Sequence, residues 1–103
     1  MKLNSFSPIP EDDEELHLPE LVYWASLGGL AEVEQLLASG SDANSADEEG
    51  YSALHAAAEN GYLDVVKLLI SKGADAQHKA QYTALELAEM AGSAEVAAYL
   101  KSL

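Results

Sequence analysis

The sequence predicts an all-α chain made of tandem units, each with two short helices and a loop. The main evidence is internal repetition: LASGSDANS and ISKGADAQH superpose at a shift of 33 residues, which pairs Gly40 with Gly73. Between the glycines, leucine, valine and alanine recur at spacings of three and four residues, as on the apolar face of a helix. Alanine and leucine supply much of the apolar content and phenylalanine occurs once, which suits thin helical layers.

Residues 1–18 lie before the repeats. They contain the stretch SPIPEDDEEL, in which two prolines precede a run of five acidic residues. This composition is typical of a solvated, flexible arm, so we expect an acidic arm, with docking through Phe6 or Ile9 as the alternative. The repeats then begin at Pro19, which fits the first turn of a helix, and Glu20 adds favourable negative charge there.

Residues 50–76, GYSALHAAAENGYLDVVKLLISKGADA, contain most of one complete unit. Ser52 supplies a hydroxyl that can cap a first helix, whose apolar stripe includes Leu54, and Thr83 can do the same in the next unit. Gly61 can end that helix, because glycine accepts the left-handed cap conformation. A second helix follows, and its broad apolar face predicts packing on several sides. This face comprises Leu63, Val65, Val66, Leu68, Leu69 and Ile70.

This unit resembles an ankyrin repeat. The family pattern is G-x-T-P-L-H-x-A-A-x-x-G followed by V-V-x-L-L-x-x-G-A-D. It is matched at Gly50, Ser52, Leu54, His55, Ala57, Ala58, Gly61, Val65, Val66, Leu68, Leu69, Gly73, Ala74 and Asp75. Ala53 stands where the family usually has proline, and the resemblance extends over residues 19–103. It implies an ankyrin-repeat solenoid, in which antiparallel helix pairs stack into a curved slab and loops project from it at right angles.

The outer units depart from this pattern in two ways. The second loop, ADAQHKAQYTA, is two residues shorter than the first, which puts its projecting finger in doubt. Polar residues also occupy stacking positions in both outer units, namely Glu32, Gln35, Glu86, Glu89 and Lys101. Terminal repeats need a polar outer face. We therefore divide the repeat domain, residues 19–103, into an N-terminal cap (20–44), one full repeat (45–76) and a C-terminal cap (77–103), and we expect a complete, short array.

Charge limits the possible partners. The chain has 18 acidic and 5 basic residues, for a net charge of −13, and residues 21–50 contain no basic residue. Like charge repels both nucleic acid and anionic membranes, so we expect neither as a partner and favour a basic protein partner. The alternative is that the acidity only maintains solubility. The absence of cysteine and of any apolar run near the ~18 residues of a membrane span fits a cytoplasmic protein.

The sequence offers little catalytic chemistry. The histidines are His17, His55 and His78, and none lies three or four residues from another, as helical metal ligands would. The resemblance gives His55 a structural role, in which it bonds to loop backbone. The EDDEE run lacks the spaced oxygen ligands of an EF-hand loop, and Ser52 has no sequence neighbour that resembles a general base. We therefore predict no enzyme activity, no metal and no cofactor.

The resemblance also implies that a partner binds the concave face, formed by the loop tips and the exposed sides of the first helices. Mapped onto this chain, the face comprises Ser26, Leu27, Glu48, Glu49, Tyr51, Glu59, Asn60, Tyr82, Met90 and Ala91. We expect Tyr51, Tyr82 and Met90 to act as anchors, because large apolar side chains within a charged rim are typical of protein interfaces. The alternative is that they are merely exposed. Trp24 is expected to fill the open end of the stack.

Together these features predict a non-catalytic protein–protein interaction module, monomeric when free, that binds a basic protein and possibly inhibits it. A sharper version is an immunity protein or antitoxin that neutralises a basic toxin enzyme such as a nuclease. A second hypothesis is a self-associating scaffold, in which an incompletely capped end stacks on another copy. An unrecognised enzyme is a third, which a deep polar pocket would support.

Overall fold

The computed structural model describes residues 19–103, and the acidic arm expected over residues 1–18 lies outside them. Within the described range the regular elements are helices. They are α1 (Glu20–Leu27), α2 (Leu30–Ala38), α3 (Ala53–Glu59), α4 (Leu63–Ser71), α5 (Ala84–Ala91) and α6 (Ala94–Lys101). The predicted all-α fold class is therefore confirmed for this part of the chain.

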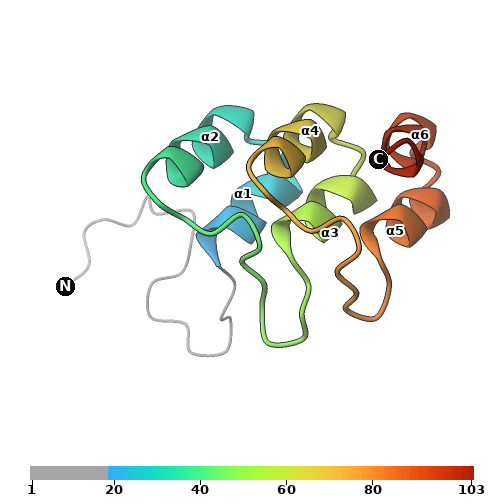
Figure 1. Ribbon diagram of the computed structural model, residues 1–103, viewed down its shortest axis with the longest axis horizontal. Helices are drawn as coiled ribbons and strands as arrows, with labels where there is room; N and C mark the ends of the chain where they lie inside the picture. The colour runs from blue at the N-terminus through green and yellow to red at the C-terminus, as the bar shows by residue number, and fades with distance from the viewer. Residues whose placement is uncertain (1–18) are drawn as a thin grey trace.

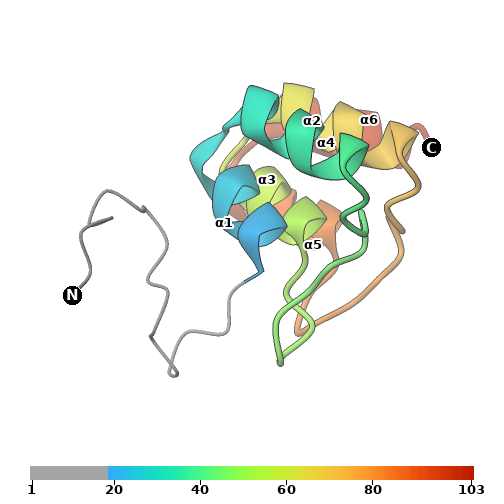
Figure 2. The same ribbon diagram turned by 90° about the vertical axis from the view of Figure 1, so that its left-hand side faces the viewer.

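The helices lie in two layers (Figure 1). One layer contains α1, α3 and α5, the other contains α2, α4 and α6, and each helix of the first layer contacts the next helix along the chain. The loops after α2 and α4 extend away from the layers on the same side (Figure 2). This is the solenoid of stacked antiparallel helix pairs with projecting loops that the sequence predicted.

Helix α3 is buried on nearly all sides, and small side chains make this possible. It packs between α1 and α5 and also contacts α4. Ala53, Ala56, Ala57 and Ala58 expose none of their surface. A methyl side chain at each of these positions allows the neighbouring backbones to approach closely, so three helices fit side by side in one thin layer.

The first helix of each of the last two pairs begins with a reciprocal cap. In α3, the Ser52 hydroxyl oxygen accepts the N–H of His55 at 3.3 Å, and Nδ1 of His55 accepts the N–H of Ser52 at 3.0 Å. In α5, Oγ1 of Thr83 accepts the N–H of Glu86 at 3.1 Å, and Oε1 of Glu86 accepts the N–H of Thr83 at 2.9 Å. Both predicted hydroxyl caps are confirmed. His55 and Glu86, which share one repeat position, each accept the backbone N–H of the cap residue.

Gly28 shows how the short turns between the two layers pack. Its φ of 75° lies in the left-handed region, and it ends α1 by donating its N–H to the carbonyl of Ala25. A Cβ at this position would lie 2.7 Å from the ring of Tyr62, which belongs to the next turn. Glycine is thus required both by the backbone conformation and by the close contact between consecutive turns.

The second loop keeps a projecting finger despite its shorter length. In the first loop, an isolated backbone bridge joins Ala46 to Ser52, and in the second loop a corresponding bridge joins Lys79 to Thr83. The two residues that the second loop lacks are missing from the turn between its bridge partners, so the turn of the second finger is shorter. The shorter length left it open whether this loop forms a finger, and the Lys79–Thr83 bridge shows that it does.

The two ends of the stack expose polar side chains. Glu32 and Gln35 are exposed on α2, whereas Val65, at the repeat position of Glu32, retains 1% of its surface. At the other end Glu86, Glu89 and Lys101 are exposed. Trp24, on α1 in the first pair, is partly buried against the core. These exposures agree with polar outer faces, while the three-part division of the array stays a prediction.

The stacking register can be tested at Leu69, which is fully buried between the pairs. Leu69→Ala leaves a cavity in a well-packed layer, so we expect the free energy of unfolding to fall by about 2–5 kcal/mol. Leu103→Ala is the matched control, because that leucine is 58% exposed and its loss should change little. Urea unfolding followed by circular dichroism measures both, and equal midpoints for the two variants would contradict the register.

Candidate interaction surface

The tip of the first finger, residues 45–52, is organised by the carboxylate of Asp47. One oxygen of Asp47 accepts the N–H groups of Glu49 and Tyr51, each at 2.9 Å. The carbonyl of Asp47 accepts the N–H of Gly50 at 3.0 Å, and Gly50 has a φ of 87°. These bonds close a tight turn, so the tip has a defined shape and its acidic side chains point outward from a fixed backbone.

Tyr51 connects the finger to the exposed side of α3. Its ring stacks on the ring of His55, with centroids 5.8 Å apart and an interplanar angle of 22°. Its hydroxyl donates to Oε1 of Glu59 at 2.5 Å, at the far end of α3. Burial raises the pKa of Tyr51, and the hydrogen bond to Glu59 raises it further, so the phenol stays a hydrogen-bond donor. The predicted anchor is half-buried and has a structural role as well.

His55 lies at the centre of this region and is 1% exposed. Its Nδ1 accepts from the backbone N–H of Ser52, which places the ring proton on Nε2. Nε2 makes no hydrogen bond to other residues of the described range. Burial lowers the pKa of His55, and the nearby ring of His78 lowers it further, so the imidazole is neutral at physiological pH. The structural role expected for His55 takes the form of a helix cap.

His55 and His78 meet in the folded chain, a contact that no pattern in the sequence predicted. The edge of one ring packs against the other, with centroids 5.5 Å apart. Nε2 of His78 lies 2.9 Å from the carbonyl oxygen of Gly50 in the first finger and donates to it. The second loop is thereby attached to the first. Asn44 adds a second tie, because its side-chain oxygen accepts the N–H of Asp75 at 2.7 Å.

The residues predicted for the concave face divide into two groups. Glu48, Glu49, Tyr51 and Tyr82 belong to the fingers, at the start of α3 and α5. Ser26, Leu27, Glu59, Asn60, Met90 and Ala91 lie at the opposite ends of α1, α3 and α5. A seven-residue helix such as α3 is about 10 Å long, so the two groups lie about that distance apart along it. The Tyr51–Glu59 bond joins them.

Exposure distinguishes the members of this face. Met90 is 62% exposed, Leu27 54% and Tyr82 38%. Ser26 and Asn60 use their side chains locally: the hydroxyl of Ser26 donates to the carbonyl of Tyr23 at 2.7 Å, and the amide of Asn60 donates to the carbonyl of Ala56 at 2.9 Å. The side chains most available to a partner are therefore the three exposed apolar residues and the two carboxylates of the first fingertip.

Sequence reasoning missed two residues of this surface, Asp47 and His78. A signal for Asp47 existed, because an aspartate three residues before a glycine is typical of a turn closed by the aspartate side chain. No comparable signal existed for His78, since its contacts are with residues of the preceding repeat.

Residues 19–103 contain no group of three or more histidine, cysteine, aspartate or glutamate side chains placed to hold a metal ion. None of the helices in this range has the length and apolar character to cross a bilayer.

Comparison with known proteins identifies the repeat. A family described as ankyrin repeats, in three copies, matches residues 21–102. Relatives include the ankyrin repeat domain-containing protein 49 of Bos taurus, 38% identical over 72% of this chain and 32% of its own length. Serine/threonine-protein kinase 12 of Arabidopsis thaliana is 34% identical over 84% of this chain and 19% of its own length.

A third relative is the ankyrin repeat and KH domain-containing protein mask-1 of Caenorhabditis elegans, 40% identical over 78% of this chain and 3% of its own length. The chain thus spans a third or less of each of these relatives. The matches fall within the repeat array, and the remaining parts of those proteins lie outside them.

The burial of neutral His55 predicts a pH dependence of stability. The unfolded chain takes up a proton on this residue near its ordinary pKa of about 6.5, whereas the folded chain does so only at lower pH. The contribution of His55 is therefore fully present above about pH 6.5 and is lost as the pH falls below it. Urea unfolding at about pH 7.5 and about pH 5.5 should show lower stability at the lower pH.

Two variants serve as controls for this pH effect. His55→Gln removes the titrating group, so its pH dependence over this interval should shrink even if the variant is less stable throughout. His78→Gln should keep most of the dependence. Equal stability of the parent chain at both pH values would show that the folded state protonates His55 as readily as the unfolded state does.

Proposed function

The chain belongs to the ankyrin-repeat family, and from this premise we propose that it is a non-catalytic binding module that holds a basic protein on its concave face. Ankyrin repeats are generally protein–protein interaction modules. The basic character of the partner and the use of the concave face are our inference for this chain.

The observation that carries the proposal is the first fingertip. Glu48 and Glu49 are exposed on a turn whose backbone is held by Asp47, and their carboxylates make no hydrogen bond or ion pair to other residues between 19 and 103. Two unpaired carboxylates on a rigid support form a preorganised site for lysine or arginine side chains, because little conformational freedom is lost when they are engaged.

Exposed apolar side chains supply the second half of such an interface. Tyr82 follows the second finger, while Leu27 and Met90 lie at the ends of α1 and α5. Protein interfaces concentrate their binding energy in a few large side chains surrounded by polar ones. In our proposal the fingertip carboxylates attract the partner, and these three side chains are buried when it docks.

The charge of the chain argues against other classes of partner. A net charge of −13 repels the phosphates of nucleic acids and of anionic lipids. A basic protein gains from the same field, which accelerates its encounter with this surface. If the partner is an enzyme whose own cleft binds phosphate groups, the fingertip carboxylates compete with its substrate, and binding inhibits it.

Ankyrin repeats are generally non-catalytic, and this supports a binding role. Some relatives carry the repeats within enzymes, among them the 2-5A-dependent ribonuclease of Mus musculus, 38% identical over 65% of this chain. That activity belongs to the relative as a whole, since the match covers 9% of its length. The seryl and histidyl side chains that meet in this chain, Ser52 and His55, are both buried in a helix cap.

The proposal is tested by isolating partners of the chain and then mapping where they bind. The purified chain is used to isolate partners from a lysate of its source organism, and each captured protein is then produced separately. Hydrogen exchange of the complex should show new protection in the fingers, α3 and α5. A partner that is acidic, or protection confined to α2, α4 and α6, would overturn the proposal.

Fingertip charge should act on the rate of encounter. We expect the double variant Glu48→Lys and Glu49→Lys to associate more slowly with the captured partner at low salt. The difference should shrink at high salt, because exposed charges are screened beyond about 8 Å at physiological ionic strength. Glu34→Lys with Glu95→Lys is the matched control, since it changes the net charge equally at exposed positions on α2 and α6. Stopped-flow kinetics that are equal for both double variants would assign the effect to net charge alone.

The anchor role is best tested at Tyr82. We expect Tyr82→Ala to weaken binding by about 2 kcal/mol, within the hot-spot range, mainly through faster dissociation, because a neutral contact does not steer encounter. Tyr62→Ala is the control: Tyr62 has the same exposure, 38%, but lies in the turn between α3 and α4, away from the fingers. Surface plasmon resonance measures both rates. Equal losses for the two tyrosines would place the partner elsewhere.

A further inference from the structure

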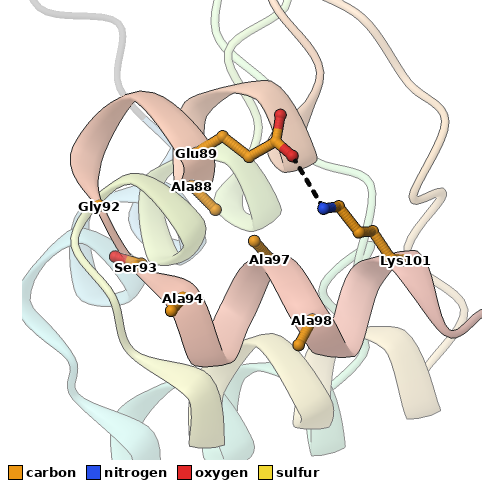
Figure 3. A pocket seen from close by; sticks show the side chains of 8 residues that line it. All are labelled: Ala88, Glu89, Gly92, Ser93, Ala94, Ala97, Ala98 and Lys101. Atoms are coloured by element: carbon orange, nitrogen blue, oxygen red, sulfur yellow. Dashed lines mark ion pairs between the residues drawn. The ribbon is translucent and has the colours of Figure 1, made fainter.

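The C-terminal end of the stack contains a hollow between α5 and α6 (Figure 3). Its volume is about 460 Å³, and it is lined by Ala88, Glu89, Gly92, Ser93, Ala94, Ala97, Ala98 and Lys101. Ala88 on α5 and Ala97 on α6 point toward each other, and an ion pair of 3.3 Å joins Glu89 to Lys101 at one side. The lining is thus made of small side chains, with a charged pair at the rim.

The repeat register shows what this surface corresponds to within the stack. Residues of α6 lie 31 positions after those of α4, so Ala98 corresponds to Lys67 and Lys101 to Ile70. Lys67 faces the following pair, because its Nζ lies 5.6 Å from the ring centroid of Tyr99 on α6. Ala98 therefore faces the place where a further helix pair would lie. On the α6 side of the hollow, Ala94, Ala97 and Ala98 replace the larger Leu63, Val66 and Lys67 of the middle pair.

The N-terminal end of the stack presents the opposite features. Trp24 and Glu32 both lie close to Gly29: a Cβ at Gly29 would lie 3.0 Å from the Trp24 ring and 2.8 Å from Oε1 of Glu32. Gly29 has the repeat position of Tyr62, whose ring lies against Gly28 of the preceding turn, so we infer that Trp24 and Glu32 face the side on which a preceding pair would lie. In later pairs the positions of Trp24 and Glu32 are held by buried residues. These residues are Ala57 and Ala88 for Trp24, and Val65 and Val96 for Glu32.

We propose that the two ends are complementary and that a second copy of this chain stacks on the first, head to tail. Repeating the packing of α5 and α6 on α3 and α4 brings Trp24 of the second copy onto the alanine-lined hollow. It also brings Glu32 of that copy toward the rim that carries Lys101. A large ring meets a hollow, and the carboxylate of Glu32 approaches the ammonium group of Lys101, which is then shared with Glu89.

This contact is heterologous, which determines how it grows. Each copy keeps one free end of each kind after stacking, so association continues with concentration instead of stopping at a dimer. The fingers extend from the side of the stack (Figure 2), so the contact leaves the concave face open and goes beyond the binding function proposed above. This proposal differs from the sequence-based expectation that the free chain is a monomer.

The dependence of association on salt concentration distinguishes stacking from the binding of a basic partner. Two copies that each carry a net charge of −13 repel one another, and screening weakens that repulsion. Stacking should therefore strengthen with salt, whereas binding of a basic protein to the fingertip should weaken. The two proposals can fail independently.

Sedimentation velocity of the full chain tests the stacking. At about 1 M NaCl, where the Debye length is ~3 Å, the weight-average sedimentation coefficient should rise steadily with concentration. Trp24 is the only tryptophan of the chain, so its emission should shift to the blue over the same range as the ring is covered. A coefficient that does not depend on concentration, or that levels off at the value of a dimer, would overturn the proposal.

Charge reversal identifies the surfaces, and it is best measured at about 0.1 M NaCl, where close charges still act on each other. Lys101→Glu places like charges at the contact and should lose most of the concentration dependence, and Glu32→Lys should do the same. Lys72→Glu, at an exposed lysine that follows α4, is the control and should retain it. A mixture of the Lys101→Glu and Glu32→Lys chains should regain association, because each end then meets an opposite charge.

Circular dichroism of each variant verifies that it folds. If the Lys101→Glu and Lys72→Glu chains sediment alike, or if the mixture does not recover, the ends of the stack do not form the contact.

Discussion

Helix α3 is packed closely between α1 and α5, and this packing decides which side chains are buried and where the first finger begins. Ala56 and Ala57 have no exposed surface, and only such small side chains let three helices lie side by side in one layer. This packing also buries His55, which must then remain neutral and find a hydrogen-bond partner. Its Nδ1 accepts the N–H of Ser52, so one interaction satisfies this ring nitrogen, caps the helix and fixes where the first finger leaves it.

The candidate surface follows from that fixed starting point. Asp47 closes the fingertip through two backbone N–H groups, and Tyr51 lies between the finger and Glu59 on α3. The second loop is joined to the first through His78 and Gly50. Side chains available to a partner are thus held by a support whose hydrogen bonds are already made, which lowers the entropy lost on binding. An acidic tip on such a support suits a positively charged partner.

Much of the fold was accessible from the sequence, and less of the surface. The helix pairs, the hydroxyl caps at Ser52 and Thr83, and the burial of Leu69 were all predicted and are all present. The conformation of the shorter second loop was not predicted, because the local sequence does not show that a backbone bridge forms in a loop with two residues fewer. The set of binding residues was mapped from the resemblance, and its role in binding stays a prediction.

The repeat, the order of the helices and the polar character of the two ends could all be inferred from the amino-acid sequence. These features depend on spacing and on cap chemistry, which act within a few residues of the chain. The pairs of side chains that meet across the fold, such as Tyr51 with Glu59 and His55 with His78, are visible in the folded chain alone. Such contacts depend on how closely neighbouring helices and loops approach one another. That separation is set by the packing of whole layers, to which many residues contribute at once.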